Sequence, residues 1–494
     1  MSELILLLPI LLPVTAGLLA GFLPCFRRDR ALYPFMIAAS FLTLFSAILA
    51  AVLPTETVTL LSPGSVMAIT FRMDDTARFF SLIASAAWCI TAVYSCRYMK
   101  HEDEHPRFYA FYLIVIGFLN ALFTAANLFT MYLTFELMTL CSMPLVLHIR
   151  SKEAVYAGMK YLFYSMAGAL FGLFGFIVLS TFGDPLMFRK GGVLDAAMIA
   201  GKEPLFLTAV FLMIVGFCTK GGMFPMHAWL PSAHPIAPAP ASAQLSAVIT
   251  KAGVLCVIRT VYFIASPALL TGTWVQTAWM CLALLTIFMG SMMAYREHGI
   301  KKRLAYSTIS QVSYIFLGLS LMTPAAVLGA LLHVVFHMAA KSTLFLATGS
   351  IIHNTGNTRV DDLRGIGLSM PVTMWCWTIA GLSLVGIPPT SAFLSKWYLA
   401  EGALAFGAGQ TGLPAVLSWL ATVILLVSAL LTAGYLLTVS VRAFFPGRNF
   451  DRKPLHGLED HRSMMIPTAV FAGLSLVLGL YAEPLIRFFS QMIL

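Results

Sequence analysis

Charged residues are scarce in this sequence. They make up 11% of its 494 residues, whereas 59% are hydrophobic, a composition that excludes a soluble globular protein. Apolar runs of about 20 residues recur along the chain, which is the length of a membrane-crossing helix. A transmembrane β-barrel would instead show segments of about ten residues with alternating polarity. The sequence therefore predicts an all-α polytopic membrane protein.

Cysteine is also sparse, and its placement excludes several kinds of chemistry. The eight cysteines include no CxxC pair and no Cys–His spacing of a metal site. A GxGxxG string occurs at residues 407–412, but it lies between two predicted membrane spans and follows no strand, so it is not the fingerprint of a dinucleotide-binding fold, and the chain lacks the cysteine clusters of iron–sulfur centres. We expect no metal, no cofactor and no redox chemistry of its own, so any electron transfer would belong to partner proteins.

About fourteen membrane spans are predicted from apolar runs that are separated by charged or Pro/Gly-rich breaks. The first run is expected to be a span and not a removed signal, because no basic segment precedes it. The predicted spans are 3–25, 31–53, 79–98, 107–126, 128–149, 155–182, 203–226, 240–265, 272–295, 304–322, 324–350, 370–403, 415–441 and 463–488. With an even number of spans, both termini lie on the same side.

The basic residues in the loops test this span count, and membrane topology explains the net charge of +10 without a nucleic-acid partner. The odd-numbered loops hold Arg27, Arg28, Arg30, Arg97, Lys100, Arg107, Arg150, Lys152, Lys160, Arg296, Lys301, Lys302, Arg303, Arg359, Arg364, Arg442, Arg448, Arg452, Lys453 and Arg462. The even-numbered loops and the C-terminal end hold only Arg72, Arg78, Arg189, Lys190, Lys202 and Arg487. The positive-inside rule therefore predicts cytoplasmic odd loops and non-cytoplasmic termini in a cell (inner) membrane protein.

A few charges remain inside the predicted spans. They are Lys220, Lys251, Arg259, Lys341 and Lys396, together with the carboxylate of Glu136. A charge at mid-bilayer costs about 3 kcal/mol on insertion scales, so several in one bundle require a reason. Snorkelling or a static ion pair is the structural alternative. It is favoured for Arg259, whereas a functional role is favoured for the four lysines, which lie far from span ends.

Two of these lysines lie beside helix-breaking segments. Lys220 is followed by Gly221, Gly222 and Pro225, and Lys396 follows Gly386, Pro388 and Pro389. The breaks fall in the seventh and twelfth spans, five helices apart, which is typical of a transporter built from two inverted halves. Because freed backbone groups are tolerated only beside water or protein, each break predicts a hydrated site near mid-membrane.

The eleventh span carries a polar stripe. His333, His337 and Lys341 are spaced at i, i+4 and i+8, on one helical face. Lone histidines in apolar helices are usually core groups, but three titratable side chains in register favour a proton relay. A haem or metal site is a competing interpretation, which would need ligands from other helices. The other histidines considered for it, His148, His227, His234 and His353, lie near span ends.

Buried lysines suit proton transfer because desolvation disfavours the charged ammonium and a nearby carboxylate restores it. A small movement of Glu136 relative to Lys220 could therefore switch proton affinity. A series of such lysines and histidines would act as a proton wire whose sites are charged and discharged by their neighbours.

Five segments together resemble one family. They are FELMTLCS, KGGMFPMHAWLPSAHPIAPAPASAQLSAVITKAGV, KKRLAYSTISQVSY, LLHVVFHMAAKSTLFLATG and GIPPTSAFLSKWYL. Their order and sequence resemble the antiporter-like subunits of Mrp-type cation/proton antiporters, respiratory NADH dehydrogenase (complex I) and membrane-bound hydrogenases, over residues of about 70 to 440. The resemblance implies fourteen helices in one transmembrane domain, residues 1–494, with broken helices seven and twelve. It also implies two inverted five-helix repeats, at 107–265 and 272–441.

The resemblance also implies roles for individual residues along a central hydrophilic axis. Glu136 and Lys220 resemble the paired charge of the first half-channel, and Lys251 the connecting lysine. His333, His337 and Lys341 resemble the link into the second half-channel, and Lys396 its terminal lysine. One respiratory class has glutamate where Lys396 stands, and the largest members continue into a lateral helix, so the shorter D-type member is expected. A hydrogenase-associated homologue remains open.

The leading hypothesis is a proton-translocating subunit that works with other membrane subunits in the bilayer and moves H⁺, with Na⁺ exchanged in the antiporter case. A self-contained secondary carrier for Na⁺ or a small solute would share broken helices and intramembrane charge. The excess of basic groups in the spans favours protons over a dehydrated cation. A redox enzyme lacks support in the motifs, and a passive scaffold predicts that neutralising the buried charges is harmless.

Overall fold

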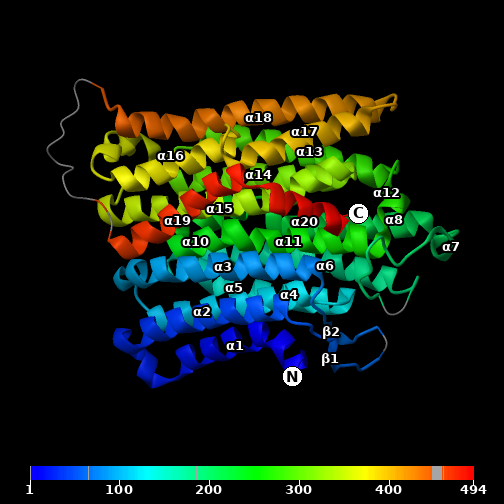
Figure 1. Cartoon of the computed structure of the whole chain (residues 1–494), viewed down its shortest axis with the longest axis horizontal. Coiled ribbons are helices and arrows are strands. Elements are labelled where there is room, and N and C mark those ends of the chain that lie inside the picture. Colours follow the sequence, from blue (N-terminus) through cyan, green and yellow to red (C-terminus); the bar gives the residue numbers. More distant parts are fainter. Residues whose placement is uncertain (1, 65, 184–185, 448–458, 460, 494) are drawn as a thin grey trace. The chain divides into compact units, whose positions relative to one another are not determined.

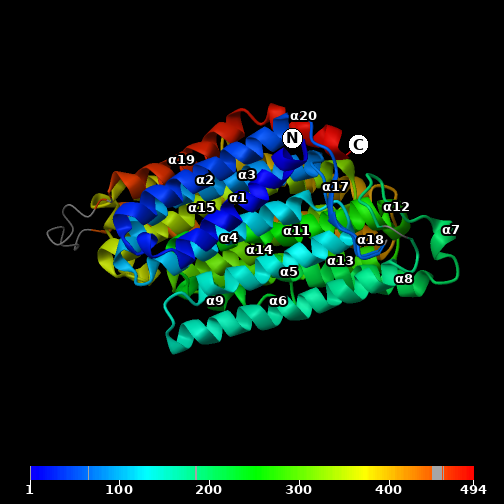
Figure 2. The same ribbon diagram turned by 90° about the horizontal axis from the view of Figure 1, so that it is seen from below.

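The computed structural model describes residues 2–64, 66–183, 186–447, 459 and 461–493, and these residues are mostly helical (Figures 1 and 2). In this part of the chain, thirteen helices are long and apolar enough to cross a membrane. The number becomes fourteen if the bent pair Val360–Leu368 and Pro371–Val385 forms one span. The predicted all-α architecture with about fourteen spans is thus confirmed. The loop residues Arg448, Arg452 and Lys453 lie outside the described residues.

The helices group into two compact units. The first comprises Met1–Ala92, Asp103–Trp229 and Val248–Trp279. It contains α1 (Ser2–Phe22), α2 (Asp29–Val52), most of α3 (Asp75–Tyr98), α4 (His105–Thr124), α5 (Leu128–Val146), α6 (Lys152–Leu179), α7 (Ala196–Ile199), α8 (Glu203–Cys218), α11 (Thr250–Ile258) and α12 (Pro267–Leu270). Within it, α1 packs on α2 and α4, α6 packs on α5 and α8, and α11 packs on α8.

A short hairpin precedes α3, where the sequence had indicated only a loop. Its strands β1 (Val58–Leu61) and β2 (Ile69–Phe71) are antiparallel, with Thr59 opposite Thr70. The hairpin is tied to the start of α5, because Thr70 N donates to Thr130 Oγ1 at 2.9 Å and Thr70 O accepts from Ala126 N at 2.9 Å. These bonds satisfy backbone groups that would otherwise be unpaired at a sheet edge.

The second unit comprises Val93–Glu102, Leu230–Ala247 and Met280–Leu494. It contains α9 (Leu230–Ile236), α10 (Ala239–Gln244), most of α13 (Trp274–Arg296), α14 (Ile300–Leu321), α15 (Pro324–Thr355), α16 (Pro371–Val385), α17 (Ser391–Gly407), α18 (Leu413–Phe444), α19 (Arg462–Leu480) and α20 (Glu483–Ile493). The long helix α15 is the centre of this unit and packs against α10, α14, α16, α17 and α19. Its middle portion is wholly buried.

Small residues allow helices to approach closely inside the first unit. A Cβ at Gly168 of α6 would lie 2.5 Å from the carbonyl oxygen of Gly216 on α8, and a Cβ at Gly216 would clash with the carbonyl oxygen of Gly168. The two backbones are therefore in direct contact, as small residues permit in membrane bundles. This contact fixes where the end of α8 lies against α6.

The two helix-breaking segments interrupt helices as predicted. α8 ends at Cys218 and passes into a 3-10 turn, Thr219–Gly221, where the predicted seventh span ran on to residue 226. α16 ends at Val385 and α17 begins at Ser391, within the predicted twelfth span. At each break a glycine adopts a left-handed conformation, with φ of 73° at Gly222 and 89° at Gly386. That the two breaks belong to inverted repeats remains a prediction.

Candidate functional site

Lys220 lies in the 3-10 turn after α8 and is completely buried. Its Nζ donates hydrogen bonds to Tyr161 Oη at 2.7 Å and to Ser165 Oγ at 3.2 Å, both on α6. Tyr161 Oη is in turn 2.6 Å from Ser142 Oγ on α5. The ammonium also lies over the Tyr161 ring, 4.4 Å from its centroid. Neutral hydroxyl groups and a ring face therefore surround this lysine.

The local backbone explains why Lys220 reaches this hydroxyl cluster. The glycine contact between α6 and α8 brings the end of α8 against the face of α6 that carries Tyr161. The carbonyl oxygen of Thr219 accepts a 3.0 Å backbone hydrogen bond from Gly222 N and a 2.8 Å hydrogen bond from Trp229 Nε1. The Trp229 ring packs on the Tyr161 ring, with centroids 4.7 Å apart. Carbonyls at a helix end need such partners.

Glu136 lies on α5 and is only half-buried. Tyr132, one turn earlier, donates from its Oη to Glu136 Oε1 at 3.4 Å. Glu136 and Lys220 act on each other electrostatically, but the ion pairs found among the described residues do not include this pair. Among the described residues the two charges are therefore close enough to influence each other but do not form an ion pair.

Lys251 lies in the first turn of α11 and is 2% exposed. Its Nζ donates to Thr250 Oγ1 at 3.3 Å. Two residues later, Gly253 packs directly on the Lys220 region, because a Cβ there would meet Lys220 Cβ at 2.9 Å and clash with the Phe217 carbonyl oxygen. The helix that carries Lys251 is therefore seated against the turn that carries Lys220.

In the second unit, the predicted polar stripe lies on one continuous helix. His333, His337 and Lys341 are all completely buried on α15. His333 Nδ1 is 2.8 Å from Ser395 Oγ on α17, and the His333 and His337 ring centroids are 6.0 Å apart. Lys341 Nζ donates to the Leu304 carbonyl oxygen of α14 at 3.1 Å. The stripe therefore runs between α17 at one end and α14 at the other.

Lys396 lies on α17, one residue after Ser395, and is partly buried. Its Nζ donates to the carbonyl oxygens of Leu384 and Val385, at 2.6 and 3.0 Å. These are the last carbonyls of α16, which the break at Gly386 leaves without helical partners. A cation is favourable at this negative end of a helix. The break thus supplies the ligands that hold Lys396.

One tyrosine connects Lys396 with the α15 stripe. The Tyr314 ring of α14 lies 5.2 Å from Lys396 Nζ and packs edge-on against His333, with ring centroids 5.5 Å apart. The structure therefore brings His333, His337 and Lys396 into one cluster of the second unit. Glu136, Lys220 and Lys251 belong to the first unit.

His234 is a buried titratable group whose place near a span end gave no signal of a role in the sequence. Located on α9, it is completely buried, and its ring stacks on Phe345 with centroids 4.8 Å apart. Neither of its ring nitrogens has a hydrogen-bond partner among the described residues. Phe345 follows Lys341 by one turn of α15, and the charge of Lys341 acts on His234. Buried polar groups rarely lack partners, so this histidine requires an explanation.

Lys301 approaches the same histidine from the start of α14. It is almost completely buried, and its Nζ donates to the Ala237 carbonyl oxygen just after α9 at 2.9 Å. Its charge acts on His234, and the charge of Glu102 acts on Lys301. The burial of Lys301 was not visible in the sequence, because the adjacent Lys302 and Arg303 give the segment the pattern of a solvated loop.

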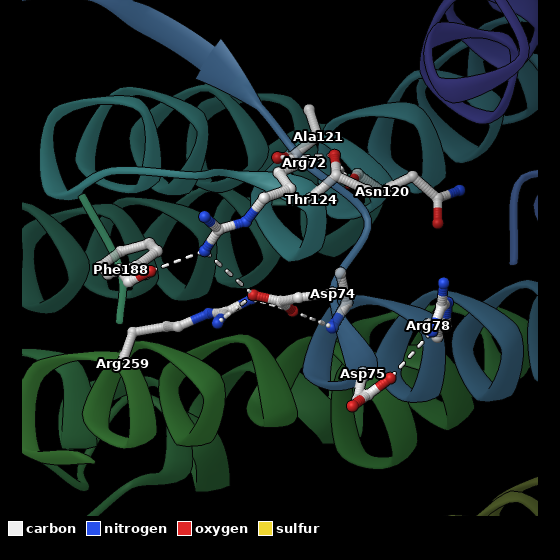
Figure 3. A network of polar contacts seen from close by, with 10 residues as sticks. Arg72, Asp74, Asp75, Arg78, Asn120, Ala121, Thr124, Phe188 and Arg259 are labelled. Atoms are coloured by element: carbon white, nitrogen blue, oxygen red, sulfur yellow. Dashed lines mark hydrogen bonds and ion pairs between the residues drawn. The ribbon is translucent and has the colours of Figure 1, made fainter. Parts of the chain in front are cut away.

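Arg259 forms a static ion pair, the alternative that the sequence favoured (Figure 3). Its two Nη atoms donate to the two carboxylate oxygens of Asp74, each at 2.7 Å. The guanidinium lies over the rings of Phe188 and Phe263, with centroids 5.0 and 4.6 Å away. Arg72 is 3.6 Å from the same carboxylate.

This contact network lowers the pKa of Asp74. Burial alone would raise it, but the charge and hydrogen bonds of Arg259, the backbone N–H of Ala77 and the charge of Arg72 together hold the Asp74 pKa below its ordinary value of 3.8. Asp74 precedes α3 and lies outside every predicted span, which is why hydropathy could not assign a partner to Arg259. Among the described residues, no group of three or more His, Cys, Asp or Glu side chains is arranged to hold a metal ion.

The family model described as NADH:quinone oxidoreductase/Mrp antiporter, TM, matches residues 125–424. The N subunit of the NADH-quinone oxidoreductase of Desulforudis audaxviator is 34% identical, over 80% of this chain and 78% of the relative. The D subunit of the Na(+)/H(+) antiporter of Bacillus subtilis is 28% identical, over 97% of this chain and 94% of the relative. The matched segment contains every residue of the candidate pathway that the sequence singled out.

A solved structure shares the fold. It is a chain of the membrane-bound sulfane sulfur reductase, an archaeal respiratory membrane complex. The TM-score is 0.84 at 23% identity, over 98% of this chain and 97% of that chain. At this identity the likeness shows the fold alone.

Proposed function

Because this chain belongs to the NADH:quinone oxidoreductase/Mrp antiporter transmembrane family, we propose that it is a proton-translocating subunit of a multi-subunit membrane complex. The complex would be an Mrp-type Na⁺/H⁺ antiporter with this chain in the D position, or an NADH dehydrogenase-type or hydrogenase-type complex with this chain in the ion-pumping module. We expect H⁺ as the transported ion in each case, and Na⁺ in exchange in the antiporter case.

The way in which the buried lysines are held carries this proposal. Lys220 donates to hydroxyl groups, Lys341 to a backbone carbonyl and Lys396 to two carbonyls. A lysine in a static ion pair cannot lose its proton without leaving a buried carboxylate unpaired. A lysine held by neutral oxygens can lose and regain it, because hydroxyls and carbonyls accept hydrogen bonds from either form of the amine.

In the first unit, Glu136 is the proposed control element. When it approaches Lys220 its carboxylate favours the ammonium form, and when it withdraws, burial favours the neutral amine. The hydroxyls of Tyr161, Ser142 and Ser165 supply the hydrogen-bonded contacts along which a proton leaves or reaches Lys220. Lys251, on the helix seated against Lys220, is the proposed next acceptor.

In the second unit, the proposed route runs from Lys341 along His337 and His333 to Lys396. Ser395 is hydrogen-bonded to His333, and Tyr314 contacts both His333 and Lys396, so hydroxyl groups lie at the histidine–lysine junction. His234 and Lys301 extend the route towards Glu102 and the odd-numbered loops. We retain the interpretation of two inverted repeats, at 107–265 and 272–441, as part of this proposal.

The proposed orientation places the odd-numbered loops in the cytoplasm and both termini on the other side of the cell (inner) membrane, as the distribution of basic loop residues supports. The chain is proposed to act with other membrane subunits, since its relatives are named as subunits. A self-contained carrier is the alternative. It is distinguished by reconstituting the purified chain alone in liposomes, which on our proposal gives no coupled exchange at the rate of the native complex.

Flux measurements in membrane vesicles that contain the native complex test the proposal. Glu136→Gln and Lys220→Gln, each with assembly verified by co-purification, are expected to lower proton flux by about tenfold or more. Glu153→Gln and Lys152→Gln, which alter exposed charges at the start of α6, are the controls and should leave flux unchanged. Near-normal flux in both Glu136→Gln and Lys220→Gln would support a passive scaffold instead.

A further inference from the structure

An amphipathic groove lies at one end of the first unit, and its lining includes none of the candidate pathway residues. It occupies about 700 Å³, which is within the range of roughly 300–1,000 Å³ typical of ligand sites. Its walls are the last turns of α1 and the first turns of α4, which α1 contacts closely at Gly17. Both helix ends lead into odd-numbered loops, at the predicted cytoplasmic surface of the membrane.

The groove changes from apolar to charged along its length. Leu18, Phe111 and Ile114 line the part that follows the helices into the bilayer, and Leu18 is 44% exposed. Arg27 and Arg107 line the part at the helix ends, with His105 and Glu104 beside them. An apolar trough that ends in two guanidinium groups at the level of a membrane surface matches one kind of molecule, an anionic amphiphile.

The charged end has unused hydrogen-bond donors. Arg107 Nη2 donates to the His148 carbonyl oxygen at 2.6 Å, whereas Arg107 Nη1 and His105 Nδ1 are buried and have no hydrogen-bond partner among the described residues. The N-terminus of the 20-residue helix α4 has no side-chain cap and opens at the same place. Uncapped N–H groups and a free guanidinium nitrogen are the donors that bind phosphate oxygens.

We propose that this groove binds an acidic phospholipid, with its phosphate between Arg27 and Arg107 and an acyl chain along Leu18, Phe111 and Ile114. Among the lining residues, Arg27 and Arg107 outnumber the carboxylate of Glu104, while Asp29 lies outside the lining with its Oδ1 3.9 Å from His105 Nε2. The lining itself therefore favours an anionic headgroup over a zwitterionic one. Anionic lipids are abundant in the cytoplasmic leaflet, which is the leaflet that the predicted topology gives to this end of α1 and α4. The site is independent of the proposed transport function.

Lipid binding to the purified native complex, measured by native mass spectrometry during titration, tests the proposal. The probes are phosphatidylglycerol, phosphatidylcholine of the same chain length, and inorganic phosphate. The complex should bind phosphatidylglycerol more tightly than phosphatidylcholine, and inorganic phosphate should compete weakly. The double variant Arg27→Gln/Arg107→Gln should raise the Kd for phosphatidylglycerol about tenfold. Leu18→Trp, which fills the apolar part, should weaken both lipids.

The matched control is Arg28→Gln/Arg30→Gln, which removes the same charge from exposed residues close to Arg27, one just before α2 and one in its first turn, that do not line the groove. It should leave the Kd within about twofold of the parent. Equal losses in the two double variants, or unchanged binding in both the Arg27/Arg107 variant and Leu18→Trp, would overturn the proposal. If inorganic phosphate competed as strongly as the lipid does, the groove would be a site for small anions and not for a phospholipid. If a photoreactive group at position 18, in place of Leu18, cross-linked to a protein of discrete mass, the groove would be a protein interface and not a lipid site.

Discussion

Arg259 donates hydrogen bonds to the Asp74 carboxylate from both of its Nη atoms, at 2.7 Å each, and its guanidinium lies over two phenylalanine rings. This geometry contrasts with that of Lys220, whose Nζ donates to the hydroxyl groups of Tyr161 and Ser165. Guanidinium keeps its proton at all accessible pH values, so Arg259 can orient and neutralise but cannot relay. The buried cations of the first unit are therefore of two kinds, one structural and one suited to proton transfer.

The Asp74–Arg259 pair should contribute to stability in a pH-dependent way. Asp74→Asn leaves Arg259 buried and uncompensated, so we expect a loss of about 3 kcal/mol in the free energy of unfolding. Because the Asp74 pKa is lowered in the folded state, its contribution is present above 3.8 and lost as pH falls through the lowered value. Thermal unfolding of the purified complex, measured between pH 3 and 7 in steps of about half a pH unit, tests both expectations.

The wild-type complex should consequently lose more stability on acidification than Asp74→Asn does. Asp75→Asn is the control, since Asp75 forms only an exposed pair with Arg78 and should cost less than about 1 kcal/mol. Parallel pH profiles for wild type and Asp74→Asn would show that this carboxylate does not contribute to acid stability as described.

Tyr161→Phe should lower proton flux while leaving the fold intact. The substitution keeps the ring beneath the Lys220 ammonium and removes the hydroxyl that joins Lys220 to Ser142. We expect a decrease of about tenfold or more in vesicle flux, as for loss of a proton-transfer partner. Tyr164→Phe on the same helix is the matched control. Equal flux in the two variants would remove Tyr161 from the route.

Lys396→Arg should assemble normally and lose most transport. Arginine retains the positive charge and can donate to the Leu384 and Val385 carbonyls, but it does not deprotonate. A purely structural role as a helix cap would leave Lys396→Arg almost fully active. Flux and co-purification of the complex, with Lys202→Arg in a loop as the control, distinguish the two roles.

His234→Phe should impair proton entry without disturbing packing. Phenylalanine preserves the stacking on Phe345 and removes both ring nitrogens. Lys301→Gln should have a similar effect, while Lys302→Gln, at the adjacent residue paired with Glu297, should not. We expect about a tenfold decrease in flux for the first two variants. If Lys341→Gln abolishes proton flux whereas His234→Phe and Lys301→Gln retain it, protons reach Lys341 by another route.

The topology can be tested by labelling. In a cysteine-free background, Lys302→Cys and Lys190→Cys should react with an impermeant thiol reagent from opposite sides of the membrane. Both positions are accessible in the structure. The prediction requires an odd number of spans between the two positions. Labelling from the same side would show that this number is even, and that one part of the chain has the opposite orientation to the predicted one.

The membrane architecture was predictable because burying charged groups in the bilayer is costly. Spanning helices are therefore mostly apolar, and this composition is visible in the sequence. Lys220 and Lys396 were found for the same reason, since an isolated lysine beside glycine and proline stands out in an apolar run. The glycine and proline residues that break helices also predicted the ends of α8 and α16 to within a few residues.

The groups that hold these lysines were not predictable. Tyr161 and Ser165 are ordinary residues of an apolar helix, and only the packing of α6 on α8 makes them ligands of Lys220. Asp74 gave no signal because it lies before a helix, and 185 residues separate it from Arg259. Long-range pairing of this kind depends on tertiary geometry, which periodicity and hydropathy do not encode.

Gly168 and Gly216 contact each other through backbone atoms, so no flexible side chain can move aside to make room for a larger residue at either position. An alanine at one of them would push α8 away from α6, and the hydrogen bond of Lys220 to Tyr161 would lengthen with it. Inactivating mutations in this protein should therefore include substitutions that alter no charge and touch no polar group. A survey of natural variants that scores only the titratable residues would miss them, and compensating changes would be found on the opposite helix.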